Sequence, residues 1–264
     1  CAGNSLTLTA SGANSYSWSN SATTTSVSVS PTVNISYTAT GTTTQGCSAT
    51  NSISVTVYSV PVISVNSGSI CSGNSFTLVP SGAATYTYSG GAVVSPAATS
   101  AYTISGTSSD GCAALPVVSN VTVNITPTVA VVNGAICEGQ SYTIVPSGAS
   151  SYTISGGLSV VSPTLTTSYS VSGISAAGCI SSNTAVLSVQ VNTLPVISVN
   201  SGTICSGTSF TLVPSGALTY TYQGGSAVVS PTVSSSYTVT GTGANGCVSG
   251  TAAVSDVTVF AQPT

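Results

Sequence analysis

The sequence predicts an all-β protein built as a tandem array of four small β-sandwich domains. Three landmarks recur in register along the 264 residues: a Cys-x-Gly segment, an apolar-Ser-Pro tripeptide and a Gly-Cys dipeptide. The first landmark begins at Cys1, Cys71, Cys137 and Cys205, so its spacings are 70, 66 and 68 residues. A nearly fixed spacing of this size is typical of an array of small domains or a solenoid.

Within each repeat, apolar residues alternate with Ser and Thr, as in half-buried β-strands. In the second repeat the alternation is visible at residues 76–79, 85–88 and 121–125. Turn-forming pairs such as Ser81-Gly82 separate these runs. Strand signals at intervals of about 8 to 12 residues favour β-sandwiches.

Prolines mark the expected domain boundaries, because Pro61, Pro127 and Pro195 each follow a closing strand and precede a new one. The first repeat lacks the opening strand that the other repeats carry before their first cysteine. Since long linkers are absent, we expect neighbouring domains to abut in a stiff rod. The predicted domains are residues 1–60, 61–126, 127–194 and 195–264.

The composition excludes several classes of function, because the chain has no Lys, Arg or His and only three acidic residues. Neutralising nucleic-acid phosphates requires Lys or Arg, so we expect no nucleic-acid partner. Imidazole bases, Schiff-base lysines and His-ligated metals are excluded, and we expect no enzyme, no cofactor and no metal site. Apolar runs such as 129–132 are far shorter than the roughly 18 residues of a membrane helix.

The acidic residues do not form a recognisable site. Asp110, Glu138 and Asp256 lie in three different repeats, whereas a glycosidase needs two carboxyl groups within about 5 to 10 Å of each other. Calcium prefers several acidic oxygens, and no repeat supplies more than one acid. We interpret Asp110 as a turn residue.

Aromatic and hydroxyl side chains have competing interpretations. Trp18 and Tyr16, with the Tyr-Thr-Tyr segments at 86–88 and 220–222, fit either a sugar-stacking platform or, as the alternation favours, the core. The threonine-rich faces fit flat ice binding or, more commonly, the solvent face of strands. Asn34, Asn120 and Asn124 match the Asn-x-Ser/Thr pattern, and three such matches are expected by chance in a chain so rich in Ser and Thr. The many hydroxyls could carry O-glycans.

The second repeat contains the segments ICSGNSFTLVPSGA, YTYSGG, VVSP, AYTISGTSSDGC and VTVNI, and versions of them recur in all four repeats. This pattern resembles the tandem immunoglobulin-like and PKD-like repeats of secreted surface proteins and adhesins of Bacteroidota. The resemblance implies immunoglobulin-like (Ig-like) sandwiches and export to the cell surface, commonly by the type IX route. Members of that group usually carry more charge than this chain.

The cysteines are expected to form structural disulfides in an oxidising compartment. Zinc is disfavoured because the chain has no Cys-x-x-Cys pair and no His, and a nucleophilic thiol would have no base to activate it. A domain of about 66 residues buries little surface, so a covalent link is expected to stabilise it. The predicted disulfide cysteines are Cys1, Cys47, Cys71, Cys112, Cys137, Cys179, Cys205 and Cys247.

Two pairing schemes remain open. In an Ig-like topology the first cysteine of a repeat faces the next domain, and the Gly-Cys lies at the opposite end of the sandwich, about 20 Å away along a strand. A disulfide needs Cα atoms within about 7 Å of each other. The distance between the two cysteines of one repeat therefore favours bonds between repeats, with Cys47 and Cys205 pairing to neighbouring segments. Our first expectation is the simpler scheme within repeats, Cys1–Cys47, Cys71–Cys112, Cys137–Cys179 and Cys205–Cys247. The alternative scheme between repeats is Cys1–Cys112, Cys71–Cys179 and Cys137–Cys247.

These features predict a structural role outside the cell. Sheet edges are normally protected by charge, and near-neutral surfaces promote association, so we expect copies to associate end to end in a filament or stalk. If the chain ends are those of the subunit, the first repeat leaves a groove for strand addition; in a longer polypeptide the missing strand lies upstream. The alternative function is an adhesin that recognises glycans or another cell surface.

Overall fold

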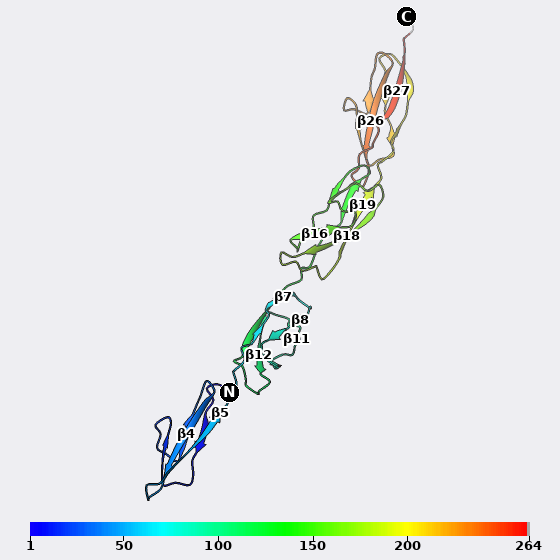
Figure 1. The fold of residues 1–264 in the computed structure, drawn as a ribbon. Helices are drawn as coiled ribbons and strands as arrows, with labels where there is room; N and C mark the ends of the chain where they lie inside the picture. The colour runs from blue at the N-terminus through cyan, green and yellow to red at the C-terminus, as the bar shows by residue number, and fades with distance from the viewer. Residues whose placement is uncertain (263–264) are drawn as a thin grey trace. The chain divides into compact units, whose positions relative to one another are not determined.

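The computed structural model describes residues 1–262, which form β-strands joined by turns, with no helix in that range (Figure 1). The chain divides into two compact units, Cys1–Ile125 and Thr126–Thr264. Within the described residues, every strand pairs with strands of its own sequence repeat. The predicted all-β class is confirmed.

The second repeat contains a complete sandwich. One sheet has the strand order β10-β12-β13-β7, and the opposite layer holds the pairs β8–β11 and β6–β9. This two-layer arrangement of short strands is Ig-like. The strands are β6 (Ser64–Val65), β7 (Gly68–Cys71), β8 (Phe76–Thr77), β9 (Pro80–Ser81), β10 (Thr85–Tyr88), β11 (Val93–Val94), β12 (Ser100–Thr107) and β13 (Val117–Asn124).

Residues 61–70, which we call the opening segment of the second repeat, take part in both layers. Its first half pairs through β6 with β9 in antiparallel orientation, and its second half leads into β7, which pairs with β13 in parallel orientation. The opening segments of the third and fourth repeats are residues 127–136 and 195–204.

The third and fourth repeats have the same topology. Their larger sheets have the orders β14-β19-β18-β16 and β21-β27-β26-β24. In the third repeat an isolated bridge between Ala130 and Ser147 takes the place of the β6–β9 pair. The third-repeat strands are β14 (Gly134–Cys137), β15 (Tyr142–Thr143), β16 (Ser151–Ile154), β17 (Val160–Val161), β18 (Thr167–Ile174) and β19 (Ala185–Asn192). The fourth-repeat strands are β20 (Ser198–Val199), β21 (Gly202–Cys205), β22 (Phe210–Thr211), β23 (Pro214–Ser215), β24 (Thr219–Tyr222), β25 (Val228–Val229), β26 (Ser235–Thr242) and β27 (Ala253–Phe260).

The first repeat forms a smaller sandwich. Its larger sheet has three strands in the order β2-β4-β5, and the pair β1–β3 forms the opposite layer. Strands β4 and β5 pair along their whole length, and no described strand lies on the outer edge of β5 (Figure 1). The strands are β1 (Leu6–Thr9), β2 (Ser15–Trp18), β3 (Ser26–Val29), β4 (Ile35–Thr42) and β5 (Ser48–Val55).

The alternation seen in the sequence becomes an alternation of buried and exposed side chains. In the second repeat the buried core includes Ile63, Leu78, Ile104 and Val121. In the first repeat Trp18 is 5% exposed, and its indole N–H donates a hydrogen bond to the Thr24 carbonyl at 2.9 Å. The core interpretation of Trp18 is therefore confirmed.

The Gly-Cys landmark is the end of a tight turn. Gly111 has φ +80°, in the left-handed region that favours glycine, and the Ser108 amide donates a hydrogen bond to the Cys112 carbonyl at 2.9 Å across the turn. Asp110 is exposed in this turn, as its interpretation as a turn residue required.

Candidate functional site

The cysteines join consecutive repeats. Cys1 is bonded to Cys112 within the first unit, and Cys137 is bonded to Cys247 within the second, with Cα–Cα distances of 5.5 and 5.7 Å. The scheme within repeats is therefore wrong. These two bonds exclude all four of its pairs, which were Cys1–Cys47, Cys71–Cys112, Cys137–Cys179 and Cys205–Cys247.

The strand topology explains the pairing between repeats. Cys137 ends β14 and aligns with Asn192, the last residue of the parallel strand β19, so it lies where the chain leaves the third repeat. Cys247 lies in the turn before β27. Because β21 runs parallel to β27, the chain enters the fourth repeat at that same end. The two sulfur atoms therefore meet at the junction, whereas the two cysteines of one repeat lie at opposite ends of its sandwich.

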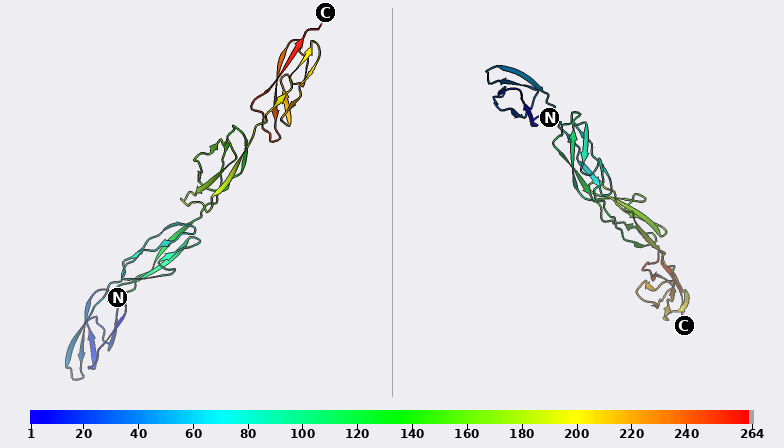
Figure 2. Two further views of the ribbon diagram at one scale, coloured as in Figure 1. Left: turned by 90° about the vertical axis from the view of Figure 1, so that its right-hand side faces the viewer. Right: turned by 90° about the horizontal axis from the view of Figure 1, so that it is seen from below.

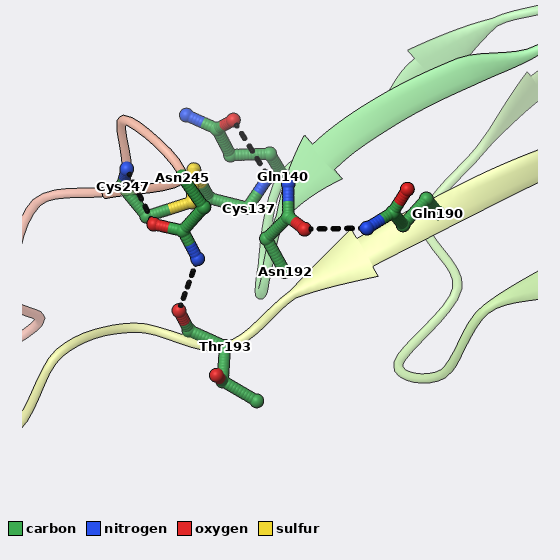
Figure 3. The surroundings of a disulfide bond; sticks show 7 residues. All are labelled: Cys137, Gln140, Gln190, Asn192, Thr193, Asn245 and Cys247. Carbon is green, nitrogen blue, oxygen red and sulfur yellow. Dashed lines mark hydrogen bonds between the residues drawn. A yellow bond between two sulfur atoms is a disulfide. The ribbon is translucent and has the colours of Figure 1, made fainter. Parts of the chain in front are cut away.

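Amide side chains hold this junction together (Figure 3). Asn245 accepts a hydrogen bond from the Cys247 amide at 3.1 Å and donates one to the carbonyl of Thr193, in the linker, at 3.1 Å. On the other side, the Cys137 amide donates to the Gln140 side-chain oxygen at 3.3 Å. The linker is thus bound to the turn that carries the disulfide.

The corresponding junction in the first unit uses the backbone of the linker. The Ala2 amide donates a hydrogen bond to the Tyr58 carbonyl at 2.9 Å, and the Cys112 sulfur lies 3.9 Å from that same carbonyl oxygen. The N-terminus consequently lies beside the end of the first repeat from which the chain continues (Figure 2).

The remaining cysteines fall into two groups. Cys71 and Cys179 also form disulfide bonds, and their pairing with each other stays a prediction. Cys47 and Cys205 are free, exposed thiols in the described part of the chain, so their predicted disulfides require partners outside it.

The first repeat contains a cavity of about 510 Å³ between its two layers. Tyr16, Trp18 and Tyr37 line it together with Ile53 of β5. Thr43 also lines the cavity, and its hydroxyl oxygen is buried without a hydrogen-bond partner among residues 1–262. We call this cavity and the outer edge of β5 the open face.

A glycine one residue before the end of the long strand that follows the Ser-Pro landmark has a role that sequence reasoning missed. A Cβ atom at this position would lie 2.6 to 2.9 Å from the Cβ atom of an alanine in the same repeat. The glycine stands at Gly41 in β4 and at Gly106 in β12, with Gly173 and Gly241 in the later repeats. Its recurrence at one position was the available signal, because glycine inside a strand marks a close approach of other groups.

The acidic residues are not brought together. Asp110 and Glu138 are exposed in separate units, and Asp256 accepts a hydrogen bond from the Ser236 hydroxyl. Residues 1–262 contain no cluster of three or more side chains suited to a metal. The described residues include no helix long and apolar enough to cross a membrane.

No protein-family model matches this chain, and no curated protein matches it. Among solved structures, it is similar to the titin I-band fragment I67–I69, with 11% identity, 78% of this chain and 100% of that chain covered, and a TM-score of 0.39. It is similar to a calcium-stabilised, ice-binding adhesin of an Antarctic bacterium, with 14% identity, 97% and 94% coverage, and a TM-score of 0.36. The insect immune protein hemolin matches at 13% identity, 98% and 96% coverage, and a TM-score of 0.27. Similarities this low indicate no particular function, and the relation to Bacteroidota repeats stays a prediction.

Proposed function

We propose that this chain is a structural segment of an extracellular filament or stalk, in which successive Ig-like domains are linked by disulfides. The observation that carries the proposal is that Cys1–Cys112 and Cys137–Cys247 each join two consecutive repeats. A bond between domains restrains the junction as well as the fold. The proposed domains are residues 1–60, 61–126, 127–194 and 195–264.

The pairing has a mechanical consequence that suits a load-bearing role. When the chain is pulled from its ends, the two bonds bypass most of the polypeptide between Cys1 and Cys247. Only the stretch from Cys112 to Cys137, roughly 25 residues or about 90 Å at full extension, can lengthen. Without the bonds, the same region could unravel to roughly 860 Å.

The chemistry also supports a position outside the cell. Disulfides persist in oxidising compartments and are rare in the cytosol. The near absence of charge leaves the sheet edges without the lysines that usually prevent association. This supports end-to-end contact between copies, whether bare or under a glycan coat, and a non-enzymatic role.

The free thiols of Cys47 and Cys205 are the proposed points at which the covalent series continues to further repeats. Cys47 holds the Gly-Cys position that Cys112 and Cys247 use to bond the repeat before them. Cys205 holds the first position, which Cys1 and Cys137 use to bond the repeat after them. Cys205 of one copy is thus chemically matched to Cys47 of the next.

The test uses three chains purified under oxidising conditions: the unmodified chain, Cys47→Ser and Cys205→Ser. We expect the unmodified chain to form a ladder of disulfide-linked oligomers on non-reducing gels, and each variant alone to stay monomeric. Mixing the two variants should give a dimer and nothing larger, because one Cys205 and one Cys47 remain. Dimers of Cys47→Ser alone would indicate symmetric Cys205–Cys205 bonds and contradict a head-to-tail series.

The alternative role, an adhesin that binds glycans, has weaker support. Stacking on a sugar requires an accessible aromatic face, and Trp18 is almost fully buried in the first repeat. A glycan array tests this role: specific glycan binding by the unmodified chain would support the adhesin, and no binding would count against it.

A further inference from the structure

The two residues of the disulfide between the third and fourth repeats differ in their contact with solvent. Cys247 is 0% exposed, whereas Cys137 is partly exposed and begins a turn whose following residues, 138–140, are exposed. Cys112, which holds the Gly-Cys position in the second repeat, is also 0% exposed. The Gly-Cys side of a bond between repeats is therefore closed to molecules in solution.

This difference decides how the bond can react. In thiol–disulfide exchange a thiolate attacks one sulfur atom, the other sulfur leaves, and access decides which sulfur is attacked. An attacking thiolate has no approach to Cys247, because no part of that residue meets solvent. Cys137 is the residue of the pair that keeps contact with solvent.

Hydrogen bonds hold Cys247 at the junction independently of the disulfide. Its carbonyl oxygen accepts a hydrogen bond from the Gly243 amide at 2.9 Å, and its own amide donates to the Asn245 side chain at 3.1 Å. The Asn245 side chain also donates to the Thr193 carbonyl of the linker at 3.1 Å (Figure 3). A Cys247 thiol released by opening of the bond therefore stays beside Cys137.

We infer that the bond between Cys137 and Cys247 opens and forms only through the sulfur of Cys137, which carries a mixed disulfide with an external thiol, RSH. In opening, the thiolate of RSH bonds to Cys137, the Cys137–Cys247 bond breaks, and Cys247 leaves as a thiolate that takes a proton from water. In closing, the Cys137 thiolate takes the RS group from the disulfide RSSR and releases one RSH. The Cys247 thiolate then attacks Cys137, and the second RSH leaves.

The charge beside Cys137 selects among external thiols. Glu138 follows Cys137 directly, is exposed, and is the one acid among residues 127–194. The sequence contains no Lys, Arg or His to offset it. A thiolate with a second negative charge is therefore repelled, and a thiolate with an ammonium group is not. One unit charge at about 6 Å in water changes a rate by roughly threefold.

The experiment uses the folded Cys47→Ser/Cys205→Ser chain, which lacks the two free thiols. The chain is exposed briefly to mercaptoethanol and quenched in acid, which protonates thiolates and stops exchange. Pepsin digestion in acid, followed by mass spectrometry, identifies the cysteine that carries the mercaptoethanol group. We expect adducts on Cys137 to exceed adducts on Cys247 by about tenfold or more, because only Cys137 can be attacked.

Unfolding and two matched variants control for the cause of this preference. In guanidinium chloride both sulfur atoms meet solvent, so the preference should disappear. Asn245→Ala frees the linker from the turn and should raise the share of Cys247 adducts. Gln190→Ala removes a side-chain hydrogen bond to Asn192 at the same junction and should leave the preference unchanged. If Asn245→Ala fails to fold, the comparison with guanidinium chloride still decides the outcome.

Three small thiols test the role of Glu138. At low salt, the rate per thiolate should fall from cysteamine to mercaptoethanol to mercaptoethanesulfonate, by roughly threefold at each step in charge. Glu138→Gln should remove most of this difference, and high salt should reduce it by screening. An equal spread of rates in both chains would contradict the selection by charge.

Several results would overturn the inference. They are equal amounts of adduct on Cys137 and Cys247 in the folded chain, an excess on Cys247, or no adduct at all until the chain unfolds. The inference goes beyond the proposed stalk function, because it concerns only the chemistry of the bond between Cys137 and Cys247. The ladder of disulfide-linked oligomers can therefore succeed or fail independently of it.

Discussion

The first and second repeats are built from the same pattern but are buried differently. Strands β5 and β13 are both eight residues long and each pairs with a long neighbouring strand. Alternate residues of β13 are buried, including Ser119 and Val121, whereas β5 is exposed along almost its whole length. The difference lies in the opening segment, which covers β13 and is absent beside β5 in the described residues.

This comparison shows that the opening segment is what buries the closing strand of a repeat. The core of a small sandwich has few layers of side chains, so one uncovered strand exposes a large part of it. The ten residues before the first cysteine supply that cover and connect each repeat to the previous one. The opening segment therefore both completes the fold of its own repeat and connects that repeat to the previous one.

The largest expected effect comes from making the second repeat resemble the first. Ile63→Asp puts a carboxylate without a partner into the core, and we expect a loss of roughly 5 kcal/mol or more in the free energy of unfolding of that repeat. Val62→Asp is the matched control, because Val62 is 89% exposed. Chemical denaturation followed by hydrogen exchange measures both, and equal effects would show that the opening segment does not complete the core.

The next effect tests the covalent link between the two repeats. Cys1→Ser removes a bond that closes a sequence separation of 111 residues, and the chain-entropy model gives about 4 to 5 kcal/mol for a loop of this size. Cys47→Ser in the same repeat should leave the melting temperature of the monomer unchanged, because that thiol is free. Thermal unfolding of both variants makes the comparison. A similar loss in Cys47→Ser would mean that Cys47 is bonded in the native protein.

The smallest effect refines the contact between the opening segment and the closing strand. Ser119→Ala removes the hydrogen bond that the buried Ser119 hydroxyl donates to the Asn66 carbonyl and should cost about 1 to 2 kcal/mol. Ser255→Ala should repeat the effect through Asn200. Ile53→Ala at the equivalent position should change stability by less than about 0.5 kcal/mol, because this side chain is 52% exposed. If Ile53→Ala were the most destabilising of the three, the open face would already be covered in solution.

Much of the architecture could be read from the order of residues. The alternation at 85–88 predicted β10, the Ser-Pro and Gly-Cys landmarks predicted the register of the repeats, and Trp18 was correctly placed in the core. These features depend on interactions between residues that are close in sequence. Side chains two apart share a face of a strand, and glycine permits the backbone of a turn wherever the turn occurs.

The cysteine partners were decided only by the tertiary structure. The spacing of Cys1 and Cys47 gives the length of chain between them but not the end of the sandwich at which each lies, and a disulfide forms only between sulfur atoms a few ångströms apart. The parallel pairing of each opening segment with its closing strand carries the first cysteine to the junction with the next repeat. Sequence therefore determined the strands, the turns and the near absence of charge, while the three-dimensional path of the chain determined which cysteines meet.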